Sequence, residues 1–205
     1  DYDKQEVRRL AESLQCPEFI AQLLWQRKLT TAKAASRFLS PKLEEAYDPF
    51  LMKDMRKAAA RLLQAKDTHE KITVYGDYDV DGTAGTALLL LILRKLGFQA
   101  NYYVPHRLHD GYGLSVSAIE DIKKSGTNLI LTVDCGISAI DEIAYANSLG
   151  IDVVVTDHHT PKETLPPAIA VVDPKREDDT YPFSELAGVG VAYKPCVWRG
   201  RNNYG

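Results

Sequence analysis

The chain has 205 residues, of which 45% are hydrophobic and 26% are charged, and its 25 basic and 28 acidic side chains give a net charge of −3. This composition is that of an ordinary folded protein and excludes an intrinsically disordered chain. The longest apolar run, at 87–93, is far shorter than the roughly 18–20 residues that a membrane span needs. No basic stretch followed by an apolar one marks a secretory signal. We therefore expect no membrane partner.

Three cysteines, Cys16, Cys135 and Cys196, are scattered along the chain. An odd number of separated cysteines is not the pattern of a disulfide scaffold and indicates a reducing compartment. The chain begins at Asp1 without an initiator methionine, so we expect a fragment of a longer protein. The small net charge neither requires nor excludes a nucleic-acid ligand, because a bound metal can supply positive charge.

The first part of the chain, 1–66, is predicted to be a small helical subdomain. Apolar residues recur at helical spacing, as at Val7, Leu10 and Leu14, and an amphipathic helix is expected over 53–65. The basic side chains around that last helix are more typical of a solvated face than of a DNA-binding surface, which is the alternative.

From Lys71 onward, short apolar runs alternate with helical stretches. Strands are expected at 72–75, 100–104, 129–133, 152–156 and 168–172, and helices at 83–96, 115–124 and 139–149. Nearly all-apolar strands that alternate with helices indicate a parallel sheet buried on both faces. The predicted fold class is α/β, with a doubly wound, mainly parallel five-stranded sheet and flanking helices over 67–194.

Unusual polar residues follow three of these strands. Asp77, Asp79 and Asp81 follow the first, Asp134 follows the third, and Asp157, His158 and His159 follow the fourth. Ligands of such sheets bind beyond the carboxyl ends of the strands. We therefore expect these side chains to meet at one edge of the sheet.

Carboxylates that are brought this close repel one another unless cations lie between them. Mixed carboxylate and imidazole ligands suit Mn²⁺, with Fe, Co or Zn as competitors, whereas Mg²⁺ prefers oxygen alone. The alternate spacing of Asp77, Asp79 and Asp81 allows an extended segment to point all three side chains one way. Asp134, at the middle strand end, is placed to bridge two ions, which is the usual apparatus of phosphoester hydrolysis.

Each motif alone has a structural explanation. An Asp-rich loop is usually a turn or a helix cap, a histidine pair is often a surface feature, and Cys135 is interpreted as a packing residue. Gly82 opens the helix expected at 83–96, whose amides can face a phosphate. Because all three polar motifs lie at the correct ends of successive strands, together they favour the metal site.

Five stretches carry a resemblance to a known family. They are VYGDYDVDGTAGTALL (74–89), YYVPHRLHDGYGL (102–114), LILTVDCGIS (129–138), VVVTDHHTP (153–161) and FSELAGVGVAYK (183–194). At these residues the chain resembles the DHH phosphoesterase superfamily and, within it, the RecJ family of single-strand-specific 5′-to-3′ exonucleases. RFLSP (37–41) and AYDPFLMKDMRKAA (46–59) extend the resemblance, which covers 3–194.

The resemblance implies roles for individual residues. Asp77, Asp79, Asp81, Asp134 and His158 would hold two Mn²⁺ ions, with Mg²⁺ as the alternative. His159 would contact the scissile phosphate or assist proton transfer, with Asp157 as a catalytic or orienting partner. Arg107 would clamp a phosphate, because a guanidinium matches phosphate bidentately. Tyr112 would stack on a base. The glycines expected to approach the substrate are Gly82, Gly111, Gly113, Gly188 and Gly190.

The chain departs from the family pattern at its end. Family members carry a further metal-ligating Asp, a second domain and usually an OB-fold downstream of the last matching stretch. The tail at 195–205 does not resemble the family, and Pro195 is expected to end the preceding helix at Lys194. We expect a truncated or frameshifted end.

The resemblance implies a metal-dependent exonuclease that acts on single-stranded DNA in repair and recombination. It also implies a bacterial cytoplasmic protein, a monomer, and repair partners such as a helicase or a single-strand-binding protein. Two alternatives stay open: another DHH phosphoesterase that acts on short oligonucleotides or cyclic dinucleotides, and a truncated chain that binds metal and DNA without turnover.

Overall fold

The computed structural model describes residues 3–106 and 113–201, and the chain divides into two compact units, Asp1–Tyr47 and Asp48–Gly205. The helices are α1 (Lys4–Leu14), α2 (Glu18–Gln26), α3 (Ala32–Leu39), α4 (Met55–Asp67), α5 (Val80–Lys95), α6 (Val116–Lys124), α7 (Ile140–Ser148) and α8 (Gly188–Arg201), with short 3-10 helices at Leu43–Glu45 and Pro49–Leu51. The strands are β1 (Lys71–Gly76), β2 (Gln99–Tyr103), β3 (Leu129–Val133), β4 (Asp152–Thr156) and β5 (Ala170–Val172). Within the described residues, no helix is both long enough and apolar enough to cross a membrane.

The first unit is built from α1, α2 and α3 around a small apolar core. Val7, Leu10 and Leu24 are buried there together with three alanines. Asp3 caps α1 by accepting from the amides of the first turn, and Thr31 caps α3 in the same way. The helical character expected for this part of the chain is present.

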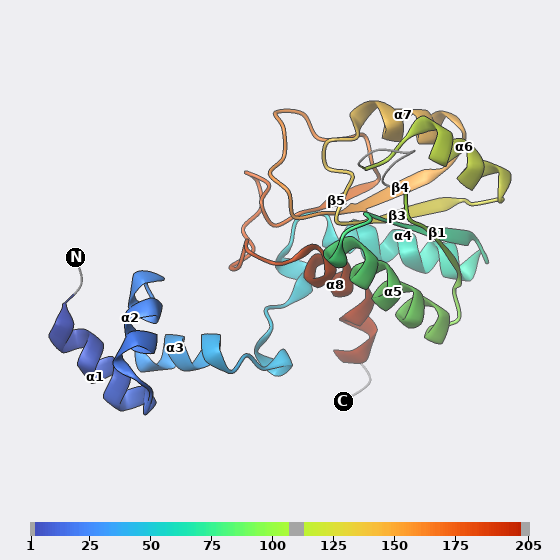
Figure 1. Cartoon of the computed structure of the whole chain (residues 1–205). Coiled ribbons are helices and arrows are strands. Elements are labelled where there is room, and N and C mark those ends of the chain that lie inside the picture. Colours follow the sequence, from blue (N-terminus) through green and yellow to red (C-terminus); the bar gives the residue numbers. More distant parts are fainter. Residues whose placement is uncertain (1–2, 107–112, 202–205) are drawn as a thin grey trace. The chain divides into compact units, whose positions relative to one another are not determined.

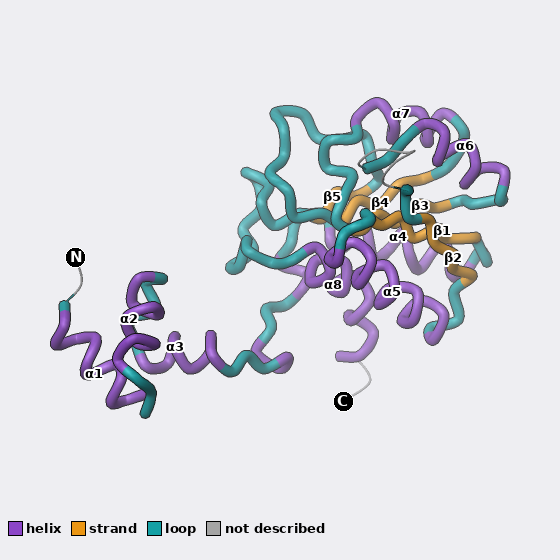
Figure 2. Tube along the Cα trace, viewed as in Figure 1, coloured by secondary structure: helices purple, strands orange, loops and turns teal. Residues whose placement is uncertain are grey.

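The second unit contains a five-stranded sheet in the order β2-β1-β3-β4-β5, and every neighbouring pair is parallel. Strand β3 lies in the middle. Helices α4, α5 and α8 cover one face of the sheet, and α6 and α7 cover the other (Figures 1 and 2). Successive side chains along each strand therefore enter opposite cores, as Ile130 and Leu131 do. The predicted doubly wound α/β class is confirmed.

The boundary between the units differs from the one predicted at residue 66. Helix α4 lies in the second unit, where Met55, Ala58, Leu62 and Ala65 share a core with the sheet. An amphipathic pattern shows that a helix has a buried face but does not show which core receives it. The change of pattern at Lys71 therefore marks the first strand rather than the start of a unit.

Helix α8 continues past Pro195, where the sequence pattern predicts a break. A proline inside a helix removes one hydrogen bond and costs about 3 kcal/mol. Burial of apolar surface offsets this cost, because Val191, Ala192 and Cys196 of this helix lie in the core of the sheet. The expected helix end at Lys194 is wrong for this reason.

In the part of the chain that the structure describes, charged side chains rather than a further strand cover the edge strand β5. The amide of Val171 donates to Asp54 Oδ2 over 3.4 Å, and Arg176 Nη1 donates to the Val171 carbonyl over 2.6 Å. Arg176 also pairs with Asp54 and with Asp178. These contacts satisfy the open edge and fix the turn that follows β5.

Replacing Met55 by alanine tests the placement of α4. Because this side chain is 1% exposed within the core of the sheet, the M55A variant should lose about 2–5 kcal/mol of unfolding free energy in urea. Gln64→Ala, on the exposed face of the same helix, should leave the transition unchanged. Equal stability of the two variants would contradict the assignment of α4 to this core.

Candidate metal centre

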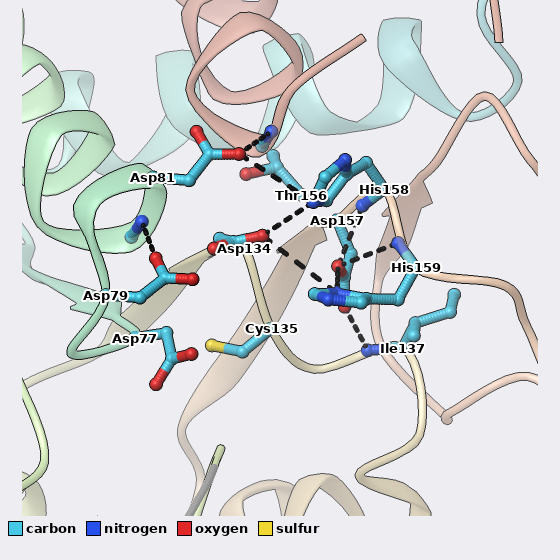
Figure 3. Close-up of polar contacts among 12 residues, drawn as sticks. Asp77, Asp79, Asp81, Asp134, Cys135, Ile137, Thr156, Asp157, His158 and His159 are labelled. Atoms are coloured by element: carbon cyan, nitrogen blue, oxygen red, sulfur yellow. Dashed lines mark hydrogen bonds and ion pairs between the residues drawn. The ribbon is translucent and has the colours of Figure 1, made fainter. Parts of the chain in front are cut away.

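The carboxyl ends of β1, β3 and β4 bring the predicted polar side chains together (Figure 3). Within the described part of the chain, two groups have ligand atoms within 4.8 Å of one another. One group is Asp77, Asp79 and Asp134, and the other is Asp134, His158 and His159. Asp134 belongs to both groups, so the arrangement has the form expected of two adjacent ion sites that share one carboxylate.

Asp134 occupies a strained position directly after the middle strand. Its φ is +60°, a left-handed conformation that aspartate tolerates better than most side chains. The residue is 1% exposed, and its Oδ1 faces the imidazole ring of His158. Burial, reinforced by the charges of Asp81 and Asp79, raises the pKa of Asp134 to about 7. A cation at this position would relieve both the desolvation and the repulsion.

His158 presents one ring nitrogen to this oxygen. Its Nδ1 lies 2.9 Å from the carbonyl oxygen of Leu186, and its Nε2 lies 2.9 Å from Asp134 Oδ1. Because a carbonyl only accepts, Nδ1 is the donor in this contact, and in the neutral ring Nε2 then carries the lone pair. A histidine held by a backbone carbonyl in this way is oriented as metal-binding histidines are.

His159 is held by its neighbour Asp157. The carboxylate of Asp157 is 1% exposed and accepts from His159 Nδ1 over 2.7 Å, from the amides of His158 and His159, and from the amide of Ile137. Burial alone would lower the pKa of His159, but the hydrogen bond and charge of Asp157 outweigh it and raise the pKa. Asp157 thus has the contacts of the orienting group rather than of a ligand.

The three aspartates after β1 do not lie on an extended segment, so that expectation is wrong. Helix α5 begins at Val80, three residues before the predicted start, and Asp79 is its N-cap, accepting from the Gly82 amide over 2.9 Å. Successive side chains turn by about 100° in a helix. The side chain of Asp81 therefore points in a different direction from those of Asp77 and Asp79. It accepts from the amides of Gly188 and Val189 over 2.6 and 2.7 Å, and its Oδ2 lies 3.7 Å from His158 Nε2.

Two of the predicted glycines are required by close packing. A Cβ at Gly82 would lie 2.6 Å from the backbone of Asp77, and one at Gly188 would lie 2.7 Å from Asp134 Oδ1. The amides of both glycines already donate to aspartates of the site. The missing side chains allow α5 and α8 to approach the strand ends. The sequence suggests a different role, in which the glycine amides face the substrate.

Among the other residues predicted to contact the substrate, Gly190 and Gly113 have ordinary structural surroundings. At Gly190 the nearest atom to an added Cβ is Leu186 Cδ2 at 3.4 Å, an ordinary contact. Gly113 has a φ of +77°, and its carbonyl accepts from the Tyr75 hydroxyl over 2.8 Å. Arg107, Gly111 and Tyr112 lie outside the residues that the structure describes.

Cys135 follows Asp134 but has the environment of a packing residue. It is 1% exposed, and burial, together with the charges of Asp157 and Asp77, raises the pKa of its thiol well above the ordinary value. A thiol in this state is a poor nucleophile.

Sequence reasoning missed a fourth strand-end carboxyl, Asp173, which directly follows β5. It is fully buried, and burial raises its pKa to about 7. Its Oδ1 accepts from the Lys175 amide over 2.8 Å, and among the described residues Oδ2 has no partner. Val172 accepts from the amide of Asp157, so Asp173 lies beside the strand end that carries both histidines. The signal was available, since an Asp-Pro pair follows the expected fifth strand.

A cavity of about 290 Å³ adjoins His159. Leu114, Ile137 and Ala139 form apolar parts of its wall, and Glu142 contributes a carboxylate. The centre therefore has an open side, reached past the half-exposed His159.

Comparison with known proteins agrees with this architecture. The profile of the DHH family, N-terminal domain, matches residues 71–204. The single-stranded-DNA-specific exonuclease RecJ of Bacillus subtilis (strain 168) is 47% identical over 192 residues, which are 94% of this chain and 24% of the relative. The chain thus spans about a quarter of the length of the curated relatives that it matches.

Solved structures give the same result. A crystal structure of exonuclease RecJ bound to manganese superposes with a TM-score of 0.68 at 37% identity, covering 78% of this chain and 40% of that one. RecJ from Thermus thermophilus in complex with Mn²⁺ superposes with a TM-score of 0.73 at 30% identity, covering 100% of this chain and 28% of the other. With about two thirds of its length matched by the family profile and its sheet shared with these structures, the chain belongs to the DHH family.

Proposed function

We propose that this chain carries the catalytic part of a metal-dependent exonuclease that hydrolyses the phosphodiesters of single-stranded DNA. The observation that carries the proposal is the buried carboxylate of Asp134, which is shared by two groups of ligand atoms from three strand ends. Relatives named as single-stranded-DNA-specific exonucleases, and RecJ structures with Mn²⁺ and Mg²⁺, support it.

The residues present suit two divalent ions. Asp77 and Asp79 would hold one ion, His158 would hold the other through Nε2, and Asp134 would bridge them. Imidazole beside carboxylate favours Mn²⁺ over Mg²⁺. When bound, such ions lower the pKa of a coordinated water and stabilise charge that develops on the phosphate. Asp81 contributes mainly by tying the start of α8 to α5.

His159 is the proposed contact to the scissile phosphate. Asp157 fixes the orientation of the ring through Nδ1. The hydrogen bond and charge of Asp157 raise the pKa of His159, and the protonated form of the ring would donate to a phosphate oxygen or to a leaving oxygen. Its ring is 47% exposed, which gives a substrate access.

The 5′-to-3′ direction, the cytoplasmic location, the monomeric state and the repair partners stay predictions from the resemblance. A phosphodiesterase of the same family that acts on short oligonucleotides or cyclic dinucleotides would use the same centre. Rates on a long single strand and on a dinucleotide, compared at equal concentration, separate the two functions.

The proposed activity is tested by Mn²⁺-dependent digestion of 5′-phosphorylated single-stranded DNA. Asp134→Asn removes the bridging charge at constant volume and should reduce digestion to the detection limit. Asp121→Asn, which changes an exposed carboxylate on α6, should leave the rate within about twofold of the parent. Full activity of D134N, or an inactive parent at saturating Mn²⁺, would contradict the proposal for these 205 residues.

A pair of glycine variants tests the geometry of the centre. In Gly188→Ala the new methyl group would meet Asp134 and displace either that carboxylate or the start of α8. We expect Mn²⁺ affinity, measured by calorimetry, to fall roughly 10–100-fold. Gly190→Ala, two residues further along the helix, should bind Mn²⁺ as the parent does. Equal affinities in a folded G188A variant would show that Asp134 does not hold the ion.

The protonation of Asp134 predicts an unusual dependence of stability on pH. Its pKa is about 7 in the folded chain against an ordinary value of 3.8. The folded state therefore binds the proton more tightly, and the stability this contributes is complete below about pH 4 and is lost as the pH rises to 7. In EDTA, D134N should exceed the parent in stability at pH 8 by on the order of 1–4 kcal/mol.

Urea unfolding at pH 5 and pH 8 measures this difference. Asp173 contributes in the same direction but is present in both proteins, so the comparison isolates Asp134. Added Mn²⁺ should stabilise the parent at pH 8 and not D134N. Identical pH dependence of parent and variant would show that Asp134 is not the group responsible.

A further inference from the structure

A second polar surface lies entirely within the first unit. A surface pocket of about 680 Å³ is formed by α3 and the segment after it, and it is lined by Lys33, Ser36, Arg37, Ser40, Lys42 and Glu45. The first four positions follow the spacing i, i+3, i+4 and i+7, which places them on one face of the helix. Three cations face one carboxylate, so the lining is positive in a chain whose net charge is −3.

The cations of this pocket differ in how they are held. Arg37 donates to the carbonyl of Glu45 over 2.7 Å, its Nε lies 3.3 Å from the Glu45 carboxylate, and its guanidinium lies 5.0 Å from the centre of the Tyr47 ring. Lys33 and Lys42 are exposed, and within the described residues neither makes an ion pair. The pocket therefore combines one positioned guanidinium with two ammonium groups whose charge is not neutralised.

This combination matches the chemistry of a sugar–phosphate backbone. A planar guanidinium binds phosphate bidentately, and serine hydroxyls donate hydrogen bonds to phosphate oxygens. A lysine ammonium adds positive charge that attracts phosphate from any direction. The ring of Tyr47, which is 36% exposed, lies beside the Arg37 guanidinium. Cations beside exposed aromatic rings are typical of surfaces that bind single strands without sequence preference. An acidic peptide would match the charge but would not use the hydroxyls and the ring.

We propose that this pocket binds the backbone of single-stranded DNA as a second contact, formed by residues other than those of the metal centre. The inference rests on the proposed function, because it takes the same strand as the substrate. The pocket contributes to binding of the strand rather than to its hydrolysis. It holds the strand by phosphate contacts that carry no sequence information.

The test replaces the two unpaired lysines in the whole chain, as Lys33→Gln with Lys42→Gln. Anisotropy of a fluorescent oligothymidylate is measured in Ca²⁺, in place of Mn²⁺ so that the strand stays intact, at several salt concentrations. The dissociation constant should rise about 5–30-fold at low salt. The slope of log K against log salt should fall by about 1.4, because each single-strand phosphate contact contributes roughly 0.7.

Two further variants control for charge and for folding. Lys4→Gln with Lys28→Gln removes the same charge from exposed positions of the same unit, outside the pocket, and should change the affinity less than twofold. Lys33→Arg with Lys42→Arg should restore binding. Thermal unfolding followed by circular dichroism checks that all variants are folded.

Three outcomes would overturn the inference: equal weakening by both glutamine pairs, no weakening by the pocket pair, or competition by polyglutamate as strong as competition by unlabelled DNA. Digestion of the strand in Mn²⁺ is recorded separately. A parent that digests DNA while the pocket pair binds normally contradicts only this inference. A parent that does not digest DNA, but whose binding depends on the pocket pair, contradicts only the proposed function.

Discussion

The structure of the site depends on one buried carboxylate, Asp134, at the end of the middle strand. A buried carboxylate beside other carboxylates costs several kcal/mol in its charged form, and Asp134 adds a left-handed backbone to that cost. Among the described residues, the surroundings do not neutralise it with a lysine or an arginine. They supply further aspartates and a histidine nitrogen that carries a lone pair. Such an arrangement is stable in its charged form only with cations. The free-energy cost of the charged carboxylate therefore favours the binding of metal ions.

The other carboxylates divide into two classes by their contacts. Asp157 and Asp81 accept backbone amides from segments distant in the sequence, Asp157 from the turn after β3 and Asp81 from the start of α8. These bonds fix the relative positions of strand ends and helices. Asp77, Asp79 and Asp134 keep oxygen atoms directed toward one another. The contacts thus suit some members of this set to positioning and others to the proposed metal ligation, although the set looks uniform in the sequence.

This division explains what the sequence could and could not predict. The meeting of Asp77, Asp134 and His158 follows from parallel strands, whose carboxyl ends share one edge. The orientation of Asp81 depends on whether α5 begins at Val80 or Thr83, and propensity does not fix a helix start to that accuracy. The need for glycine at 188 arises from contact with a residue 54 positions earlier. The placement of α4 and the helix through Pro195 likewise depend on tertiary burial, which local pattern does not contain.

Electrostatics links the two surfaces of the chain. A phosphodiester strand that approaches Asp77, Asp79, Asp81 and Asp134 meets charge of its own sign, and the ions that the centre holds act only over a short range because salt screens charges beyond about 8–10 Å. Salt screens every cation in the same way, so parts of the strand that lie farther from the centre need cations close to them, on a chain whose net charge is −3. Lys33, Arg37 and Lys42 gather such cations in one pocket of the first unit. The proposed metal centre and the proposed basic surface would therefore offset the same repulsion between an acidic chain and a phosphodiester strand.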